Sequence, residues 1–394
     1  MRRWVLSRRL AAALLAASGS LPAWQETLTR EGVYWVQTVS GSESVLPSGR
    51  LRVSTQGRVA VTGGDEGQVR YTFVKRVKAK SEAQARTLLG QFVVKSNRQG
   101  DLTSIQMAHS SDGAGSAEMQ VTAPRTLRDV IVETHGGAVD ASGLQGALQA
   151  FTGGGRIKLD RIGGAVLART AGGEISLGAI GGSVRCTSAG GPIRAGSIGG
   201  EARFETAGGD IVAREVSGPV QAATAGGAIQ IGRAGSTVSV NTAGGSISVG
   251  SSEGMVTAET SGGPIQVGKA PGVRCETGAG AIRLSNVSGS LRATTAVGSI
   301  IAQLMLGGVP AESLLSTGAG DITVYLPSNL GITIQAQNES AYNLRRIVCD
   351  FPSVQVRRQG SAVLAEGAIN GGGPVLRLAS TGGTIYIKKV SGER

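Results

Sequence analysis

The chain has 394 residues, including 63 glycines, with 3 % aromatic residues and a formal net charge of +12. So much glycine would fit a collagen-like or disordered chain, but Ile, Val and Leu recur in fixed register and no Gly-X-Y period exists, which excludes both. The scarcity of aromatic residues favours a thin aliphatic core, and no stacking residues or recognisable module indicate a nucleic-acid partner.

Residues 1–23 have the features of a secretory signal peptide. An apolar run at 10–17 and a small-residue site at 20–23 follow a basic start. The basic start carries four arginines: Arg2, Arg3, Arg8 and Arg9. The apolar run is too short to span a membrane, and no later segment reaches that length. The sequence therefore predicts an exported protein that is periplasmic, envelope-associated or secreted, with a net charge of about +8, four less than that of the whole chain.

Residues 24–130 are expected to form a cap, because repeat proteins need atypical ends that cover the last coil. Residues 50–61 resemble a degenerate coil, and residues 69–77 predict a longer strand. A short helix is expected at 81–92, where Ser81 would be the N-cap and Gln84 would complete a capping box. Further strands are expected at 92–95, 102–107 and 118–122.

Residues 131–326 repeat at an interval of 18, and the marker is a turn of the form Thr-Ala-Gly-Gly-x-Ile. The clearest copies begin at Thr170, Thr206, Thr224, Thr242 and Thr260. Such a short repeat predicts a solenoid, in which each coil buries its apolar face only against its neighbours. We expect an all-β, parallel β-solenoid (β-helix) of about ten or eleven coils, roughly 50 Å long.

Alternation within each coil predicts which side chains point inward. The Ile that follows each corner, such as Ile229, should be buried. The leading Thr also points inward, where its hydroxyl could bond to the next hydroxyl or to the corner backbone. The corner glycines are expected to supply a positive φ.

Residues 327–394 are expected to form irregular coils and a second cap, with the repeat returning at 380–385. Cys186 and Cys275 occupy one column five coils apart, which at about 4.8 Å per coil is roughly 24 Å and beyond disulfide reach. We interpret both as small buried apolar residues, and Cys349 has no evident partner.

No constellation for catalysis, cofactor binding or metal binding is predicted. The two histidines, His109 and His135, stand apart from any nucleophile, and the residue after Gly-Gly forms no acidic column of the kind that calcium-binding rolls need. Many pectin-degrading enzymes are β-helices with clustered aspartates. The aspartates of these coils, of which only the last two share a column, are Asp140, Asp160, Asp210 and Asp321.

One outward column carries arginine, interrupted by Gln221, Ser239 and Thr257. Its arginines are Arg185, Arg203, Arg274 and Arg292. The column could contact an anionic cell-envelope polymer, or it could be a solvated face. Both interpretations stay open.

The chain resembles a bacterial family known as putative adhesins. The resemblance rests on the Ser/Thr-x-Gly-x-Ile turns, the early unit at 57–61, the Tyr-Leu-Pro stretch at 325–327, and Gly371-Gly-Gly373 before the closing repeat. It implies an exported β-solenoid domain of unknown function without catalytic residues. The expected function is therefore an adhesin-like binding or structural role in the cell envelope or outside the cell, with an anionic polymer or another surface protein as partner. A polysaccharide-active enzyme of the pectin-degrading type is the alternative.

Overall fold

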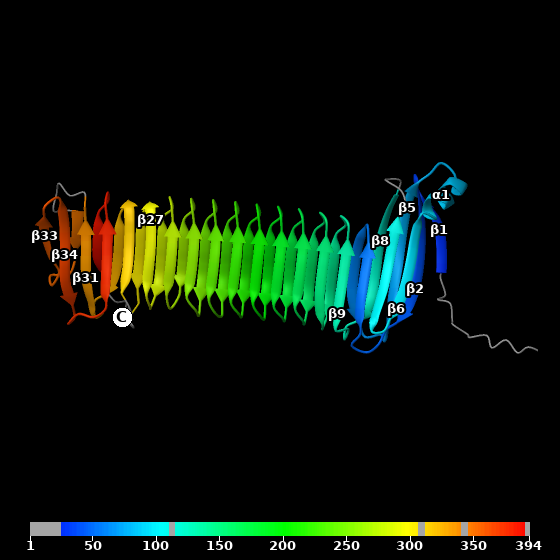
Figure 1. Cartoon of the computed structure of the whole chain (residues 1–394), viewed down its shortest axis with the longest axis horizontal. Coiled ribbons are helices and arrows are strands. Elements are labelled where there is room, and N and C mark those ends of the chain that lie inside the picture. Colours follow the sequence, from blue (N-terminus) through cyan, green and yellow to red (C-terminus); the bar gives the residue numbers. More distant parts are fainter. Residues whose placement is uncertain (1–24, 110–114, 306–311, 340–345, 391–394) are drawn as a thin grey trace, which may run out of the picture.

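The molecule is a long rod of stacked coils with an irregular cap at each end (Figure 1). The computed structural model describes residues 25–109, 115–305, 312–339 and 346–390, so the predicted signal peptide lies outside the described residues. Nearly all described segments with regular structure are strands, and α1 (Glu82–Leu89) is the one helix among them. The predicted all-β parallel solenoid with one short helix is confirmed.

Each regular coil contributes one strand to each of two parallel sheets, which we call sheet A and sheet B. The regular strands of sheet A are β10 (Val139–Leu144), β12 (Ile157–Ile162), β14 (Ile175–Ile180), β16 (Ile193–Ile198), β18 (Ile211–Val216), β20 (Ile229–Ala234), β22 (Ile247–Ser252), β24 (Ile265–Lys269), β26 (Ile282–Val287), β28 (Ile300–Leu304) and β30 (Ile322–Pro327). Those of sheet B are β9 (Asp129–Thr134), β11 (Ala147–Thr152), β13 (Val166–Thr170), β15 (Val184–Ser188), β17 (Ala202–Thr206), β19 (Val220–Thr224), β21 (Val238–Thr242), β23 (Val256–Thr260), β25 (Val273–Thr277), β27 (Leu291–Val297) and β29 (Ser313–Ala319).

The core is a set of aliphatic columns between the two sheets. Strands pair in register from coil to coil, so Ile211 lies beside Ile229 and Ile229 beside Ile247. Ile229 is 1 % exposed, which confirms the predicted register. Cys186 and Cys275 are free thiols, buried in one inward column of sheet B, as expected from their shared repeat position.

The hydroxyl at the head of each coil joins that coil to the one before it. Thr242 Oγ1 donates to the carbonyl of Gly227 at 2.9 Å and accepts from the amide of Gly245 at 3.2 Å. Equivalent hydroxyls donate to a carbonyl of the preceding corner in coils from Thr134 to Thr317. The predicted bonds from this Thr column to the corner backbone are therefore confirmed.

The expectation that corner glycines supply a positive φ is wrong for most regular coils. Gly226 and Gly227 both lie outside the left-handed region. A Cβ at Gly227 would instead stand 2.1 Å from the carbonyl oxygen of Gly209, whereas one at Gly226 would meet nothing closer than 3.8 Å. The second glycine of the corner is required because successive coils approach closely there, since real Cβ atoms keep a larger separation.

At the first end of the rod, an early coil lies inside the stack. This coil consists of β3 (Arg50–Thr55) and β4 (Arg58–Gly64). β3 pairs in parallel with β9 on one side and with β7 (Leu102–His109) on the other, while β4 lies between β10 and β8 (Gly115–Pro124).

Antiparallel strands cover this early coil. β5 (Gln68–Lys78), β2 (Tyr34–Ser44) and β1 (Gln25–Glu31) extend sheet A, and β6 (Phe92–Gln99) extends sheet B. α1 is shorter than the expected 81–92, because Phe92 already begins β6. Ser81 Oγ accepts from the amide of Gln84 at 3.3 Å, and Gln84 Oε1 accepts from the amide of Lys80 at 3.0 Å.

The other end interleaves in the same way. β31 (Ile332–Asn338), β32 (Ile347–Cys349), β33 (Gln355–Gln359) and β34 (Ala362–Ile369) are outermost. β35 (Val375–Ser380) then enters between β29 and β31, and β36 (Ile385–Val390) between β30 and β32. In Figure 1 a red strand accordingly lies between the yellow strands and the outer orange ones.

Candidate functional site

The predicted arginine column lies on the outer face of sheet B, but as two separate pairs. Arg185 is the register partner of Arg203, and Arg274 is the partner of Arg292. The interrupting polar residues, one on each of three successive strands, separate the pairs. All four arginines are exposed, so the structure offers two local cationic points instead of one continuous stripe.

A second outward column, two residues further along each strand, contains glutamates that the sequence reasoning missed. Glu205 accepts from Arg203 Nε at 2.6 Å, and Arg185 Nη2 lies 3.9 Å from the same carboxylate. One carboxylate therefore partly neutralises the first arginine pair. The signal was visible in the sequence, because Glu205, Glu259 and Glu276 share one repeat position.

The second arginine pair is less constrained. Among the described residues, no ion pair involves Arg274 or Arg292, and the same holds for Glu259 and Glu276, which are neighbours on β23 and β25. The guanidinium groups can therefore turn toward a ligand without breaking a salt bridge of their own, although two carboxylates lie on the adjacent column.

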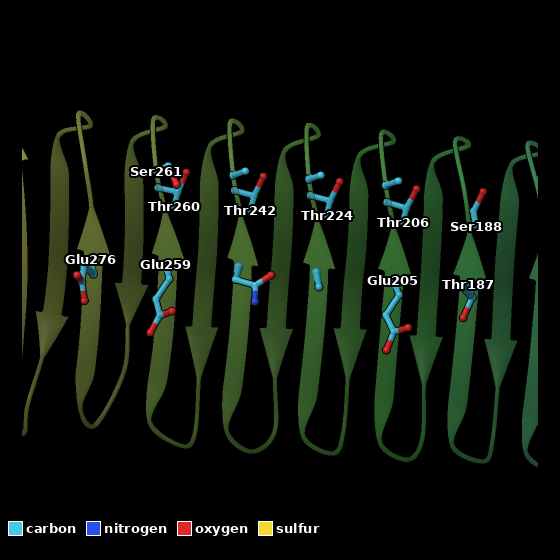
Figure 2. Close-up of a pocket in the computed structure, with 15 residues that line it drawn as sticks. Thr187, Ser188, Glu205, Thr206, Thr224, Thr242, Glu259, Thr260, Ser261 and Glu276 are labelled. Carbon is cyan, nitrogen blue, oxygen red and sulfur yellow. The ribbon is translucent and has the colours of Figure 1, made fainter.

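A shallow groove follows the Thr corner beside these columns. From Thr187 to Glu276 it encloses about 890 Å³, and it is lined by the Thr column, the small residues that follow each Thr, and the glutamate column. Figure 2 shows Thr206, Thr224, Thr242 and Thr260 in a row along it. Every oxygen of the Thr column already bonds to two corner groups, as at Thr242, so these hydroxyls have a structural role. The groups that a ligand in the groove could meet are therefore mainly those of the glutamate column.

The same line of residues continues toward the first cap as a second hollow of about 490 Å³. Phe151 stands in it, with Glu133 and Arg169 as its register partners on the neighbouring strands. Arg52 holds Glu133 through two bonds, at 2.7 and 3.2 Å. His135 is exposed at the corner of this hollow.

The aspartates that an enzyme of the pectin-degrading type would use are engaged elsewhere. Asp140 pairs with Arg58 at 2.8 Å. Asp160, Asp210 and Asp321 each accept from a backbone amide of the following coil, at 3.1, 2.8 and 2.7 Å. Each aspartate thus joins coils, and Asp140 and Asp160 lie on the adjacent strands β10 and β12, two register positions apart. Within the described ranges, no three His, Cys, Asp or Glu side chains gather where they could hold a metal ion.

Buried titratable groups also lie in the core and in the first cap. Burial raises the pKa of the Cys275 thiol to about 12 and also raises that of Cys186, so neither thiol can serve as a nucleophile at neutral pH. In the first cap, burial lowers the pKa of Lys75, whose Nζ donates to the carbonyl of Phe92 at 3.1 Å and to Gln37 Oε1 at 3.3 Å. These bonds hold β5 against β6 and β2, which is a structural role.

No family model matches the chain, and no curated protein matches it. Solved structures found similar include a putative cell adhesion protein from Clostridium sporogenes (10 % identity, 89 % of this chain and 99 % of that chain covered, TM-score 0.17). Two others are putative adhesins, from Bacteroides fragilis (11 % identity, 90 % and 97 % covered, TM-score 0.18) and from Parabacteroides distasonis (10 %, 90 % and 97 %, TM-score 0.23).

These similar structures are described as adhesins or as a cell adhesion protein, which agrees with the resemblance predicted from the sequence. At these TM-scores the likeness carries no argument about function. No helix in the part of the chain that the structure describes is long and apolar enough to cross a membrane.

Proposed function

We propose that this protein is a non-catalytic binding or structural protein of the cell envelope or the extracellular space. The proposal is supported chiefly by the outer face of sheet B, a long and regular surface that carries charged side chains on several of its strands. The engagement of all four coil aspartates in structural bonds supports binding over hydrolysis. The basic, apolar and small-residue pattern of residues 1–23 supports export.

The contact proposed for this surface is with an anionic envelope polymer, through Arg274 and Arg292. Guanidinium groups bind carboxylate and phosphate oxygens through paired hydrogen bonds. These two arginines are free of ion pairs within the described residues, whereas Arg185 and Arg203 share Glu205. The second pair should therefore contribute more to binding than the first, although all four arginines occupy one column.

Co-sedimentation of the full chain with isolated cell wall that carries anionic polymer tests this proposal. Replacing Arg274 and Arg292 together by Gln should reduce retention several-fold, and replacing Arg185 and Arg203 together is the matched control with a smaller effect. Retention should also fall as salt rises, because exposed charges are screened over about 8–10 Å at physiological ionic strength.

Equal retention of both double variants and the unchanged protein would mean that the column is only a solvated face. Release of reducing sugars from a polysaccharide panel would favour the enzyme instead. Salt-insensitive binding to a purified surface protein would identify another surface protein as the partner.

A further inference from the structure

Phe151 is an outward-facing aromatic residue in a solenoid that otherwise contains almost none. Between Thr134 and Ile322 the only aromatic residues are Phe151 and Phe204. Phe204 is fully buried in the core. Phe151 is part-exposed on the outer face of β11, in the hollow of about 490 Å³ described above. No core contact requires an aromatic side chain on this outer face, where the regular coils carry mostly small or polar residues.

Phe151 lines the hollow together with residues of the Thr corner, including Thr152 and Gly153. Gly153 forms the corner wall next to the ring, and a Cβ there would lie 2.0 Å from the carbonyl oxygen of His135. This wall therefore has to remain without a side chain, whereas Ala171 and Ala207 occupy the same position in later coils. The bare backbone at Gly153 leaves room for a ligand beside Phe151, between His135 and Ala171 at the same position of the neighbouring coils.

The charge next to the ring is positive. Glu133 is neutralised by its two bonds to Arg52. Arg169, the register partner of Phe151 on β13, is exposed and makes no ion pair among the described residues. Because adjacent strands lie about 4.8 Å apart, one ligand can contact the ring and the guanidinium together.

A sugar that carries a carboxylate has the matching chemistry. The apolar face of a sugar ring packs on an aromatic side chain, and a carboxylate accepts paired hydrogen bonds from a guanidinium. Further along the groove, Glu205, Glu259 and Glu276 would repel such a ligand. The favourable stretch is thus confined to the end nearest the first cap.

We propose that the hollow around Phe151 is a binding subsite for a carboxylate-bearing sugar of an envelope polysaccharide. Phe151 stacks on the sugar ring, and Arg169 pairs with its carboxylate. This inference rests on the proposed binding of an anionic polymer and adds the ligand class and the site. It is independent of Arg274 and Arg292, which lie on β25 and β27, seven and eight coils further along sheet B than β11.

Calorimetric titration of the full chain with an oligogalacturonate, and with its methyl-esterified form, tests the subsite. The ester keeps the sugar ring and removes the charge. Phe151→Ala should weaken binding of both ligands about three- to tenfold, as expected for aromatic packing. Arg169→Gln should weaken binding of the acid about tenfold or more and leave the ester unchanged. Val212→Ala and Arg214→Gln, exposed or part-exposed positions on β18 of sheet A, are matched controls and should change neither affinity.

Wild-type protein that does not bind the oligogalacturonate, or a Phe151→Ala variant that binds it normally, would overturn the subsite. If retention on cell wall still depends on Arg274 and Arg292 in that case, the proposed function survives without the subsite. An Arg169→Gln variant with equally weakened affinity for the acid and for the ester would also overturn the subsite, because the guanidinium would then not be binding the carboxylate. Thermal melting of each variant excludes loss of fold as the cause.

Discussion

The two glycines of a single corner should respond in opposite ways to the same substitution. In Gly227→Ala, the new Cβ would stand 2.1 Å from the oxygen and 2.4 Å from the carbon of the Gly209 carbonyl. The corner backbone must then move, and overpacking of this kind costs about 1–3 kcal/mol. The shift also disturbs the bond from the Gly227 amide to Thr224 and the bond from Thr242 to the Gly227 carbonyl. At roughly 0.5–1.5 kcal/mol for each bond, the total is about 2–6 kcal/mol.

Gly226→Ala is the control within the same turn. Its Cβ would meet no atom within 3.8 Å, and its φ is not positive, so the lower entropy of the unfolded chain should make the change neutral or stabilising by about 0.4–1 kcal/mol. Denaturant titration followed by circular dichroism measures both variants: the midpoint of Gly227→Ala should fall, and that of Gly226→Ala should stay unchanged or rise. Equal midpoints would refute the argument that close approach between coils, and not a special φ, requires the second glycine.

The other predictions concern the core, the thiols and metal ions. Ile229→Ala should lower the free energy of unfolding by about 2–5 kcal/mol in denaturant titration, and an unchanged midpoint would contradict the central position of that column. In the native protein, Cys186 and Cys275 should resist a thiol reagent while the half-buried Cys349 reacts, and all three should react after denaturation; early labelling of Cys186 or Cys275 would contradict their burial. Burial raises the pKa of Cys275 to about 12 from an unfolded value near 8.5. The stability that this thiol contributes is therefore present below about pH 8.5 and is lost as the pH rises toward 12. Cys275→Ala should reduce that loss in thermal melts at successive pH values, and an identical pH dependence of both proteins would disprove the linkage. A chelator should leave the melting temperature unchanged, since the coil aspartates bond to amides or arginine, and a large drop would indicate a metal site.

The regular coils were predictable because their determinants are local and repeated. The Ile column and the inward Thr follow from alternation within a strand, and the structure places Ile229 and Thr242 accordingly. The role of the corner glycines was not predictable from one coil, because the atom that forbids a Cβ at Gly227 belongs to the coil before it. Local turn chemistry therefore predicted glycine at this position for its positive φ, whereas the structure requires glycine there because of the close approach between coils.

The candidate site was only partly predictable for a related reason. The arginine column and its interruption are visible in the sequence, but the partial neutralisation of the first pair depends on Glu205, which lies in the adjacent column and reaches Arg203 on its own strand and Arg185 on the strand before it. The hollow around Phe151 combines residues from the first cap and from regular coils, including Ser54 and Arg169. Sequence spacing alone does not bring those segments together.

The interleaved strands near residue 380 also bear on the order in which the rod can be built. β31 and β34 are synthesised before β35 and β36, yet β35 and β36 separate them from the regular coils. A chain that folds while it emerges from the ribosome or an export channel can add coils in sequence as far as β30. After that point, β31 to β34 have no native surface on the regular coils to dock on until β35 and β36 have arrived. Closure of this end is thus the final step of assembly, and the exposed edge of β29 and β30 remains open to wrong strand pairing until then.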